Sequence, residues 1–312
     1  MRRGAVVLAL VAAAALGMPT ASALISPVPV LRLPAAQSHA YRNAAYLLFT
    51  SNSSLDPTHD DAFAWRIGTG DRVQLNADGT EGWSGGFDPG TDTALYQQIA
   101  SPTDSDLYLY DLDTDTRTAV TGIDTTAWEW SPRISHTYIS FLRYTHDHTT
   151  RHTGVYLYDR AHDRTRWVAG YTGYRFMDNG SVGDRYATWT VCGPHTCVAY
   201  VYDAVAKSLR KVPSMGRAPQ YAPVVDEASG RLFFVRGGFG CGRHVTFYVL
   251  PVRDLRATPV PIATLPAGVD TNDVASLFRI RAGGRTDLLF SRASCRAKGR
   301  ADIFALPDVP SR

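Results

Sequence analysis

The sequence predicts an all-β fold, a single six-bladed β-propeller, and three observations lead to it. A sequence motif with a Tyr-x-Tyr-Asp core, called here the repeated phrase, occurs at Tyr108–Asp111 and again at Tyr156–Asp159. Related phrases recur at steps of 44 to 56 residues, so that six units fill the chain after residue 23. Within each unit, short runs alternate apolar and polar residues between turns rich in Gly, Asp and Pro, as half-buried strands require. Repeats of this length are typical of stacked or radial architectures.

The first segment, residues 1–23, is predicted to be a secretory signal peptide and not part of the fold. Arg2 and Arg3 precede an apolar run that ends at Gly17, and a small-residue motif ends at Ala23. This charged, apolar and small-residue order is typical of such peptides, and the apolar run is shorter than the roughly 20 residues that span a bilayer. We therefore expect cleavage near Ala23 and a secreted, soluble product, residues 24–312, without a membrane span.

Each unit is expected to contribute four strands. In the third unit, the segment WEWSP comes first, a strand follows at Thr137–Thr145, and the phrase GVYLYD and a short strand after the turn RAHDR complete it. Four strands in each of six units describe a six-bladed propeller. The sixth unit stops before its outer strand, whereas Ile25–Pro34 precedes the first unit and has no partner. We expect this N-terminal strand to close the ring by joining the last blade, at an edge where prolines are tolerated.

The segments WEWSPRISHTYISFLRY and GVYLYDRAHDRTRWVA resemble the WD-like repeat of TolB-like six-bladed β-propellers. That repeat runs Trp-Ser-Pro, a turn, an Ile-x-Phe strand and an Asp-x-Tyr-x-Asp strand. The resemblance is strongest in the third unit and weakest in the fifth and sixth, and it would make this chain a secreted bacterial member. It implies the fold and a common role in binding other molecules, but no catalytic residues. No α/β domain is expected after the repeats, so a complete propeller-bearing serine peptidase is not expected.

The charge is uneven along the chain. Residues 201–312 hold 17 Lys or Arg against 9 Asp or Glu, whereas the whole chain has a net charge of +3. A one-sided basic surface attracts anionic polymers; the alternative is that the two halves of the chain complement each other. Nucleic acid is not expected as a partner, because the protein is exported and has no recognisable nucleic-acid motif.

The cysteines are expected to form structural disulfides, because export exposes them to an oxidising compartment. Cys192 and Cys197 bracket a hairpin-like turn and form the easiest pair, which leaves Cys241 and Cys295 to pair at long range. A loop of the third unit holds three candidate metal ligands, which are His146, His148 and His152. We expect these histidines to belong to a solvent-exposed loop and not to a metal site. No cofactor is expected, with a divalent cation such as calcium as the alternative.

Candidate ligand-binding residues enter the blades near one mouth of the central channel. Trp83 and Trp128 could stack on sugars or peptide side chains there, or simply pack between blades. The segments that lead into the later blades add both signs of charge and one more aromatic residue, namely Arg175, Asp178, Arg217, Tyr221, Asp270 and Asp273. Together with Asn179 and Asn272, the acidic residues could imitate the ring of acids and Asn that holds a divalent ion in lactonase-type propellers.

The sequence thus predicts a secreted, non-enzymatic and monomeric module that binds an extracellular or envelope protein, or an anionic polymer, through one mouth of the ring. No catalytic residue is assigned. The alternative is a metal-dependent hydrolase, lactonase or lyase that acts at the central channel. A purely structural role in an extracellular assembly also agrees with the sequence.

Overall fold

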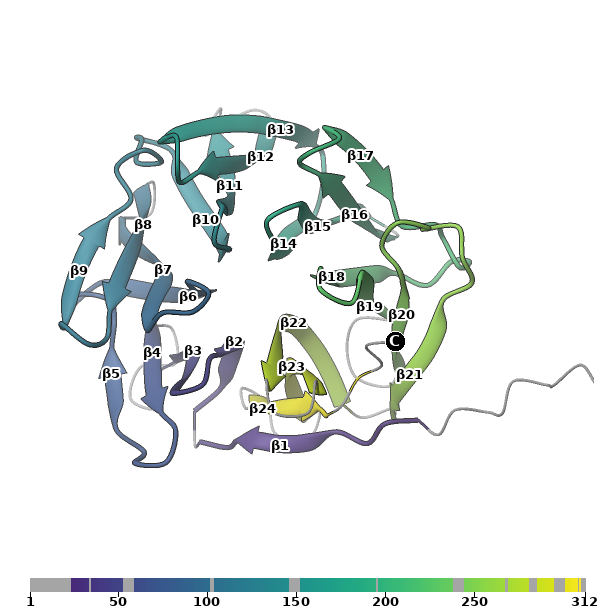
Figure 1. Cartoon of the computed structure of the whole chain (residues 1–312), viewed down its shortest axis with the longest axis horizontal. Helices are drawn as coiled ribbons and strands as arrows, with labels where there is room; N and C mark the ends of the chain where they lie inside the picture. Colours follow the sequence, from purple (N-terminus) through teal and green to yellow (C-terminus); the bar gives the residue numbers. More distant parts are fainter. Residues whose placement is uncertain are drawn as a thin grey trace, which may run out of the picture.

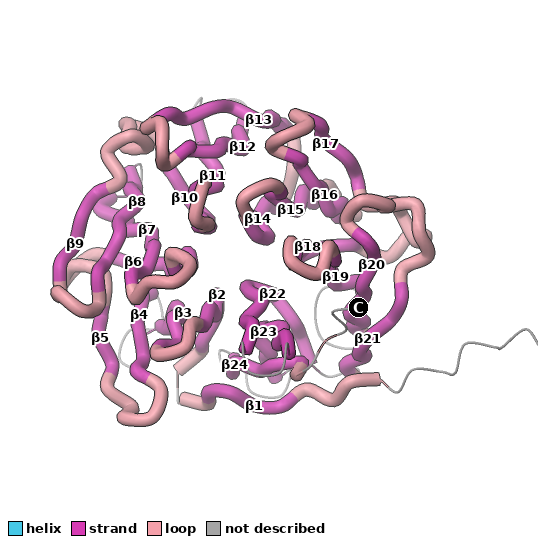
Figure 2. Tube along the Cα trace, viewed as in Figure 1, coloured by secondary structure: helices cyan, strands magenta, loops and turns pink. Residues whose placement is uncertain are grey.

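The chain forms a ring of antiparallel β-sheets around a central axis (Figure 1). Its computed structural model describes residues 24–33, 35–52, 59–101, 104–145, 152–194, 196–237, 244–266, 269–280, 285–294, 301–307 and 309. These residues form 24 strands, joined by turns and loops (Figure 2). Within the described part of the chain, no helix is long and apolar enough to cross a membrane.

The strands group into six four-stranded blades, numbered here in chain order. Blade one holds β2 (Gln37–Arg42), β3 (Tyr46–Asn52), β4 (Asp60–Arg66) and β5 (Arg72–Gln74). Blade two holds β6 (Glu81–Phe87), β7 (Thr93–Ser101), β8 (Asp104–Asp111) and β9 (Thr116–Ala119). Blade three holds β10 (Trp128–Ile134), β11 (Tyr138–Thr145), β12 (His152–Asp159) and β13 (Arg164–Thr172). One parallel bridge, between Ser105 and Trp128, joins blades two and three.

The remaining three blades follow the same plan. Blade four holds β14 (Phe176–Val182), β15 (Tyr186–Cys192), β16 (Cys197–Asp203) and β17 (Ser208–Lys211). Blade five holds β18 (Gln220–Asp226), β19 (Arg231–Gly237), β20 (Val245–Pro251) and β21 (Val260–Leu265). Blade six holds β22 (Val269–Ile280), β23 (Arg285–Ser294), β24 (Ala301–Leu306) and β1 (Val28–Leu31).

The N-terminal strand closes the ring, as the sequence predicts. β1 pairs antiparallel with β24 and is the outer strand of the sheet whose other members are β22 and β23 (Figure 1). It is shorter than the predicted segment. The amide of Ile25 donates a hydrogen bond of 2.8 Å to the carbonyl of Ile262 in blade five. The two ends of the described chain therefore share one sheet, and backbone hydrogen bonds complete the ring.

The core lies between the blades. Six clusters of buried apolar side chains occur among the described residues, and each is shared chiefly by two neighbouring blades. The repeated phrase shows how this comes about, because successive side chains of a strand point to opposite faces. In β8, Leu107 packs toward blade three, whereas Tyr110 packs toward blade one. Successive side chains of the strand therefore pack against the blades on its two sides, and this explains the alternating pattern of residues in the sequence.

One aromatic pair recurs in every blade, at the same register of the second and third strands. The rings lie 5.5 to 6.0 Å apart, centre to centre. The member on the second strand is fully buried in every blade. In blades two to four, the other member is the first tyrosine of the repeated phrase. The pairs are Phe49–Phe63, Tyr96–Tyr108, Phe141–Tyr156, Trp189–Tyr200, Phe234–Tyr248 and Phe290–Phe304.

Each inner strand also carries an irregularity. The pairing of the first strand with the second shifts in every blade, at Ser38/Tyr41, Ser84/Gly86, Trp130/Arg133, Asn179/Val182, Tyr221/Val224 and Asp270/Asp273. Blade six has a second shift, at Val274/Ser276. A β-bulge leaves backbone groups without partners in their own sheet. The neighbouring blade supplies some of these partners. The Thr50 hydroxyl accepts from the Ser84 amide at 2.9 Å, and the Thr190 hydroxyl accepts from the Ala222 amide at 3.0 Å.

We predict that removing one fully buried aromatic ring destabilises the whole ring. Trp189→Ala should lower the free energy of unfolding by about 3–5 kcal/mol, because the lost ring leaves a cavity between two blades. Trp167→Ala is the matched control, since that indole is 61% exposed and its loss should cost about 0.5 kcal/mol or less. Urea unfolding followed by circular dichroism measures both. Equal losses for the two variants would contradict the inter-blade role of Trp189.

Candidate functional site

The predicted ligand-binding residues lie at one end of the ring, called here the mouth face. It is the end at which the first strand of every blade begins, and the second strand ends there because each sheet is antiparallel. Trp83, Trp128, Asp178, Tyr221 and Asp270 all occur in the first halves of inner strands. Asp273 lies further along β22, whereas Arg175 immediately precedes β14 and Arg217 lies three residues before β18. This common placement follows from the topology, but it does not gather all eight residues into one site.

Three of the eight meet at one cavity. Arg175, Asp178 and Tyr221 line a cavity of about 430 Å³ between blades four and five. Its other lining residues include Phe176 at the start of β14 and Pro219 just before β18. Two inner strands thus provide two sides of the cavity. The hairpin that joins β15 to β16 provides the third side.

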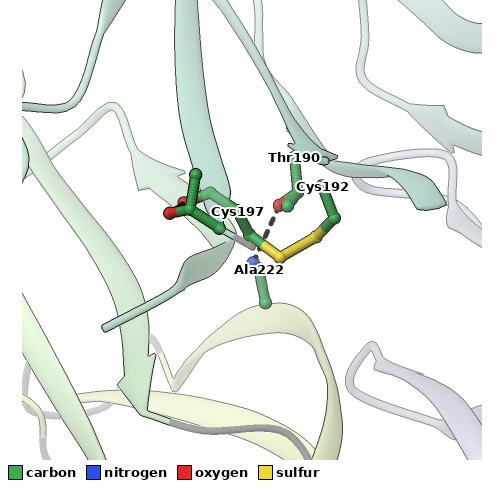
Figure 3. The surroundings of a disulfide bond; sticks show 5 residues. Thr190, Cys192, Cys197 and Ala222 are labelled. Carbon is green, nitrogen blue, oxygen red and sulfur yellow. Dashed lines mark hydrogen bonds between the residues drawn. A yellow bond between two sulfur atoms is a disulfide. The ribbon is translucent and has the colours of Figure 1, made fainter. Parts of the chain in front are cut away.

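A disulfide between Cys192 and Cys197 forms the wall of the cavity on the hairpin side (Figure 3). The two cysteines stand directly opposite each other in β15 and β16, with their Cα atoms 3.9 Å apart. This confirms the predicted local pair. Cys241 and Cys295, the predicted long-range pair, lie outside the described residues.

Two hydrogen bonds attach the disulfide hairpin to the inner strands on either side of it. The Arg175 amide donates to the Cys192 carbonyl at 2.8 Å, which ties the hairpin to the approach to β14. The Ala222 amide donates to the Thr190 hydroxyl at 3.0 Å, which ties it to β18 of blade five (Figure 3). The cavity is therefore built by rigid elements of two blades.

Asp178 forms the acidic part of the cavity lining, and the neighbouring blade holds it in place. The Ser131 hydroxyl donates a hydrogen bond to Asp178 Oδ1, and Arg133 Nη2 lies 3.6 Å from the same oxygen. Arg133 is 3% exposed and also donates to the carbonyls of Asn179, at 2.9 Å, and Gly180, at 3.1 Å. Asp178 therefore has a charge partner at the junction of blades three and four, and its first role is structural.

The rim of the cavity combines a cation with an apolar surface. The Arg175 side chain is exposed, and within the described part of the chain its guanidinium group makes no ion pair or hydrogen bond. Phe176 beside it is 46% exposed, although large aromatic side chains are usually buried. Tyr221 and Pro219 continue the apolar wall inward. This arrangement suits a ligand with an apolar group next to a carboxylate or another anion.

The other predicted residues lie elsewhere. Arg217 is exposed and does not line the cavity, and Trp128 is the first residue of β10. Asp270 and Asp273 lie in β22, and their side chains fall outside the described part of the structure. Of the three candidate metal ligands, His152 begins β12, whereas His146 and His148 lie outside the described residues. Among the residues that the structure does describe, no three His, Cys, Asp or Glu stand close enough to hold a metal ion.

Trp83 belongs to a cluster that sequence reasoning missed. Its ring stacks on His39 of blade one, with 5.8 Å between ring centres and 21° between the planes. Asp60 is close to both, and burial raises the pKa of its carboxyl group although His39 and His59 lower it. His39 has a left-handed backbone, with φ of 50°. The contributing residues come from two blades, so no local spacing in the sequence indicates the cluster.

Ser84 follows Trp83 and lies in the segment Gly82–Gly86, which has the letters Gly-x-Ser-x-Gly. In a hydrolase this pattern places an exposed serine on a tight turn. Here the segment is part of strand β6, Ser84 is 1% exposed, and its hydroxyl donates to the His39 carbonyl at 2.7 Å. Ser84 is therefore a structural link between blades one and two.

Comparisons with known proteins agree on the fold. No family of known sequences matches the chain, and no curated protein matches it in sequence. TolB from Acinetobacter baumannii superposes with a TM-score of 0.58 at 15% identity, covering 85% of this chain and 64% of that one. TolB from Agrobacterium tumefaciens gives 0.57 at 11% identity, with coverage of 89% and 92%. An oligogalacturonate lyase in complex with manganese gives 0.56 at 11% identity, with coverage of 92% and 97%.

These likenesses show an all-β propeller fold shared with TolB proteins and lyases. The chain spans slightly less than two thirds of the Acinetobacter TolB. At such low identity, the other proteins' activities do not transfer to this chain.

We predict that the disulfide stabilises the cavity wall. Replacing both Cys192 and Cys197 by alanine should lower the free energy of unfolding by about 2 kcal/mol, because a short covalent loop restricts the unfolded chain. The control is the double variant Val191→Ala and Val198→Ala, which trims the adjacent cross-strand pair and keeps the disulfide. Urea unfolding compares the two. A double cysteine variant as stable as the unaltered protein would contradict the prediction.

Proposed function

We propose that the mature chain, residues 24–312, is a secreted, monomeric, six-bladed propeller of the TolB-like kind that binds an extracellular or envelope protein without catalysing a reaction. The observation that carries this proposal is the cavity between blades four and five, where an exposed cation meets an apolar wall. The predicted signal peptide supports the extracellular setting. The basic C-terminal half of the chain supports an anionic partner.

The size and chemistry of the cavity favour a peptide segment as the ligand. Its volume of about 430 Å³ lies within the range of ligand sites in proteins, roughly 300–1,000 Å³. Such a volume takes one or two side chains of a larger partner. Binding sites are mostly apolar with a few polar groups that set orientation. Phe176, Pro219 and Tyr221 supply the apolar surface here, and Arg175 supplies the orienting charge.

The cavity has a preformed geometry. The disulfide and the hydrogen bonds of Thr190 and Arg175 fix the walls before a ligand arrives. Because the site is already ordered, binding costs little conformational entropy, which is the main benefit of preorganisation. Covering the half-exposed ring of Phe176 removes apolar surface from water and adds a hydrophobic contribution.

We predict that two rim residues control partner binding. Phe176→Ser and Arg175→Gln should each weaken capture of a saturable partner from solubilised envelope or culture supernatant by about tenfold, equivalent to about 1.4 kcal/mol. Only Arg175→Gln should also reduce the salt dependence of capture, because it removes a charge. Immobilised residues 24–312 and their variants provide the measurement.

Two matched controls separate the cavity from the rest of the surface. Val205→Ser changes an apolar side chain that is 70% exposed in the turn of the same blade, and Arg217→Gln removes an exposed cation outside the cavity lining. Both should bind like the unaltered protein. Capture that all four variants retain would place the partner site elsewhere. If the unaltered protein captures nothing, the metal-dependent channel enzyme becomes the hypothesis to test.

A further inference from the structure

The outer strand of blade three is longer than the outer strands of the other blades. β13 holds nine residues, whereas β1, β5, β9, β17 and β21 hold three to six. It runs along the outside of the ring (Figure 1) and pairs with β12 on one side only. Among the described residues, its backbone forms no other backbone hydrogen bond. The other side of β13 is therefore a long, unpaired sheet edge.

This edge has few of the features that usually prevent pairing with another chain. Unpaired N–H and C=O groups invite a further strand, and short strands and prolines are common protections. β21 contains Pro261, whereas β13 contains no proline. A bulge at Val168 divides β13, but four residues on each side of the bulge keep regular pairing with β12. The edge can therefore accept an additional strand.

Two cations mark one face of the edge. Arg164 and Arg166 lie two residues apart, so their side chains point to the same face of the strand. The Arg166 guanidinium lies 5.5 Å from the ring centre of Tyr138 and 5.6 Å from that of Tyr202 in blade four. Its Nε and Nη2 atoms are buried without a hydrogen-bond partner. Neither arginine forms an ion pair within the described part of the chain, so this face attracts negative charge.

The acidic residues at the start of β13 already have partners. Asp159 stands opposite Arg164 in β12, but its Oδ1 lies 3.0 Å from Nδ1 of His162 in a hydrogen bond. Asp163 accepts a hydrogen bond of 2.8 Å from the Tyr158 hydroxyl. Both acids lie at the turn that joins β12 to β13. The cations of the strand therefore remain available to an acidic partner.

The opposite face of the edge carries an exposed tryptophan. Thr165 and Trp167 alternate with the two arginines, and the Thr165 hydroxyl donates to the Gly122 carbonyl at 2.9 Å. Gly122 follows β9, so this face looks toward blade two. The Trp167 side chain is 61% exposed. Tryptophan is among the residues that contribute most binding energy at protein interfaces, so this indole is well placed to contact a partner.

These features together favour an added strand over other ligands. An extended segment directs alternate side chains to two faces, so acidic residues can meet the arginines while apolar residues cover Trp167. A second copy of β13 would bring further arginines to the edge, and like charges on adjacent strands are unfavourable. A polyanion would use the arginines but not the regular row of unpaired backbone groups.

We propose that β13 is a docking site for an extended segment of a partner protein, which joins blade three as a fifth strand. The segment carries acidic residues on the face toward blade four and apolar residues on the face toward blade two. Backbone hydrogen bonds supply affinity, and the alternating side chains supply specificity. The site is independent of the function proposed for the cavity between blades four and five.

The test uses a short peptide with this alternation. Fluorescein-labelled Thr-Glu-Val-Glu-Val-Glu-Thr-NH₂ is titrated into residues 24–312 and followed by fluorescence anisotropy. One matched peptide has lysine in place of every glutamate. The other is N-methylated at every glutamate and valine, which keeps the side chains and the charge but removes the backbone donors. The unmodified acidic peptide should bind at least about tenfold more tightly than either control.

Hydrogen exchange locates the bound peptide. Amides of an edge strand that face solvent exchange readily, whereas amides that pair with an added strand are protected. Mass spectrometry should therefore show slower exchange in β13 when the acidic peptide is present, and unchanged exchange in the outer strands β9 and β17.

Protein variants assign the binding to side chains of β13. Trp167→Ala should weaken binding about tenfold, and it should fold normally because the indole is largely exposed. Arg166→Gln should reduce the preference for the acidic peptide over the lysine peptide. Arg164→Gln tests the same charge effect at an exposed position, in case Arg166→Gln unfolds. Leu209→Ala, at a residue that is 43% exposed in the outer strand of blade four, is the control and should bind like the unaltered protein.

Four outcomes would overturn the proposal. They are no saturable binding at up to about 1 mM peptide, equal binding of the N-methylated peptide, unchanged exchange in β13, and full binding by Trp167→Ala. Dextran sulfate serves as a polyanion probe. If it bound more tightly than the peptide and left exchange in β13 unchanged, the arginines would belong to a polyanion site and the proposal would also be wrong.

Discussion

The structure depends on packing between neighbouring blades, because a single four-stranded blade has no core of its own. Every blade turns one aromatic pair toward the blade that precedes it, and these rings lie within the six shared clusters. Buried aromatic rings contribute large apolar areas, so each blade is stable only when the blade before it is in place. The backbone pairing of β1 with β24 extends this mutual dependence around the whole ring.

The inner strands meet a second constraint, which explains where polar groups accumulate. The strands crowd near the axis, and the bulge in each inner strand turns backbone groups out of their own sheet. Hydroxyl groups such as those of Thr50 and Thr190 satisfy some of them from the neighbouring blade. The guanidinium group of Arg133 likewise bonds backbone groups of the neighbouring blade, by donating to the carbonyls of Asn179 and Gly180. It also pairs with the Asp178 carboxylate. The mouth face therefore combines structural polar groups with those that remain open to a ligand.

The sequence could predict the fold because the same physical requirement recurs in every blade. In blades two to four, the first tyrosine of the repeated phrase meets an aromatic partner on the preceding strand. Phe63, Tyr248 and Phe304 take the same place in the other blades, where the phrase is altered. The local disulfide was predictable from two cysteines at hairpin spacing. The cavity was only partly predictable: Arg175, Asp178 and Tyr221 could be named as candidates, but Phe176 and the disulfide wall could not. His39 was missed because its stacking partner Trp83 comes from another blade.

The uneven distribution of charge over the mouth face can determine the orientation in which a partner binds. Asp104, Asp106 and Asp124 lie near one another where blades two and three meet, and Arg175, which makes no ion pair with any described residue, stands beside blade four. The two regions lie on the same end of one rigid ring, so a partner that contacts both must carry opposite charges at a fixed separation. Two weak contacts held in such a frame act as one strong contact, because the second forms at a high effective concentration. A partner with the reversed order of charges would meet like charge at both regions, so the ring itself can enforce orientation.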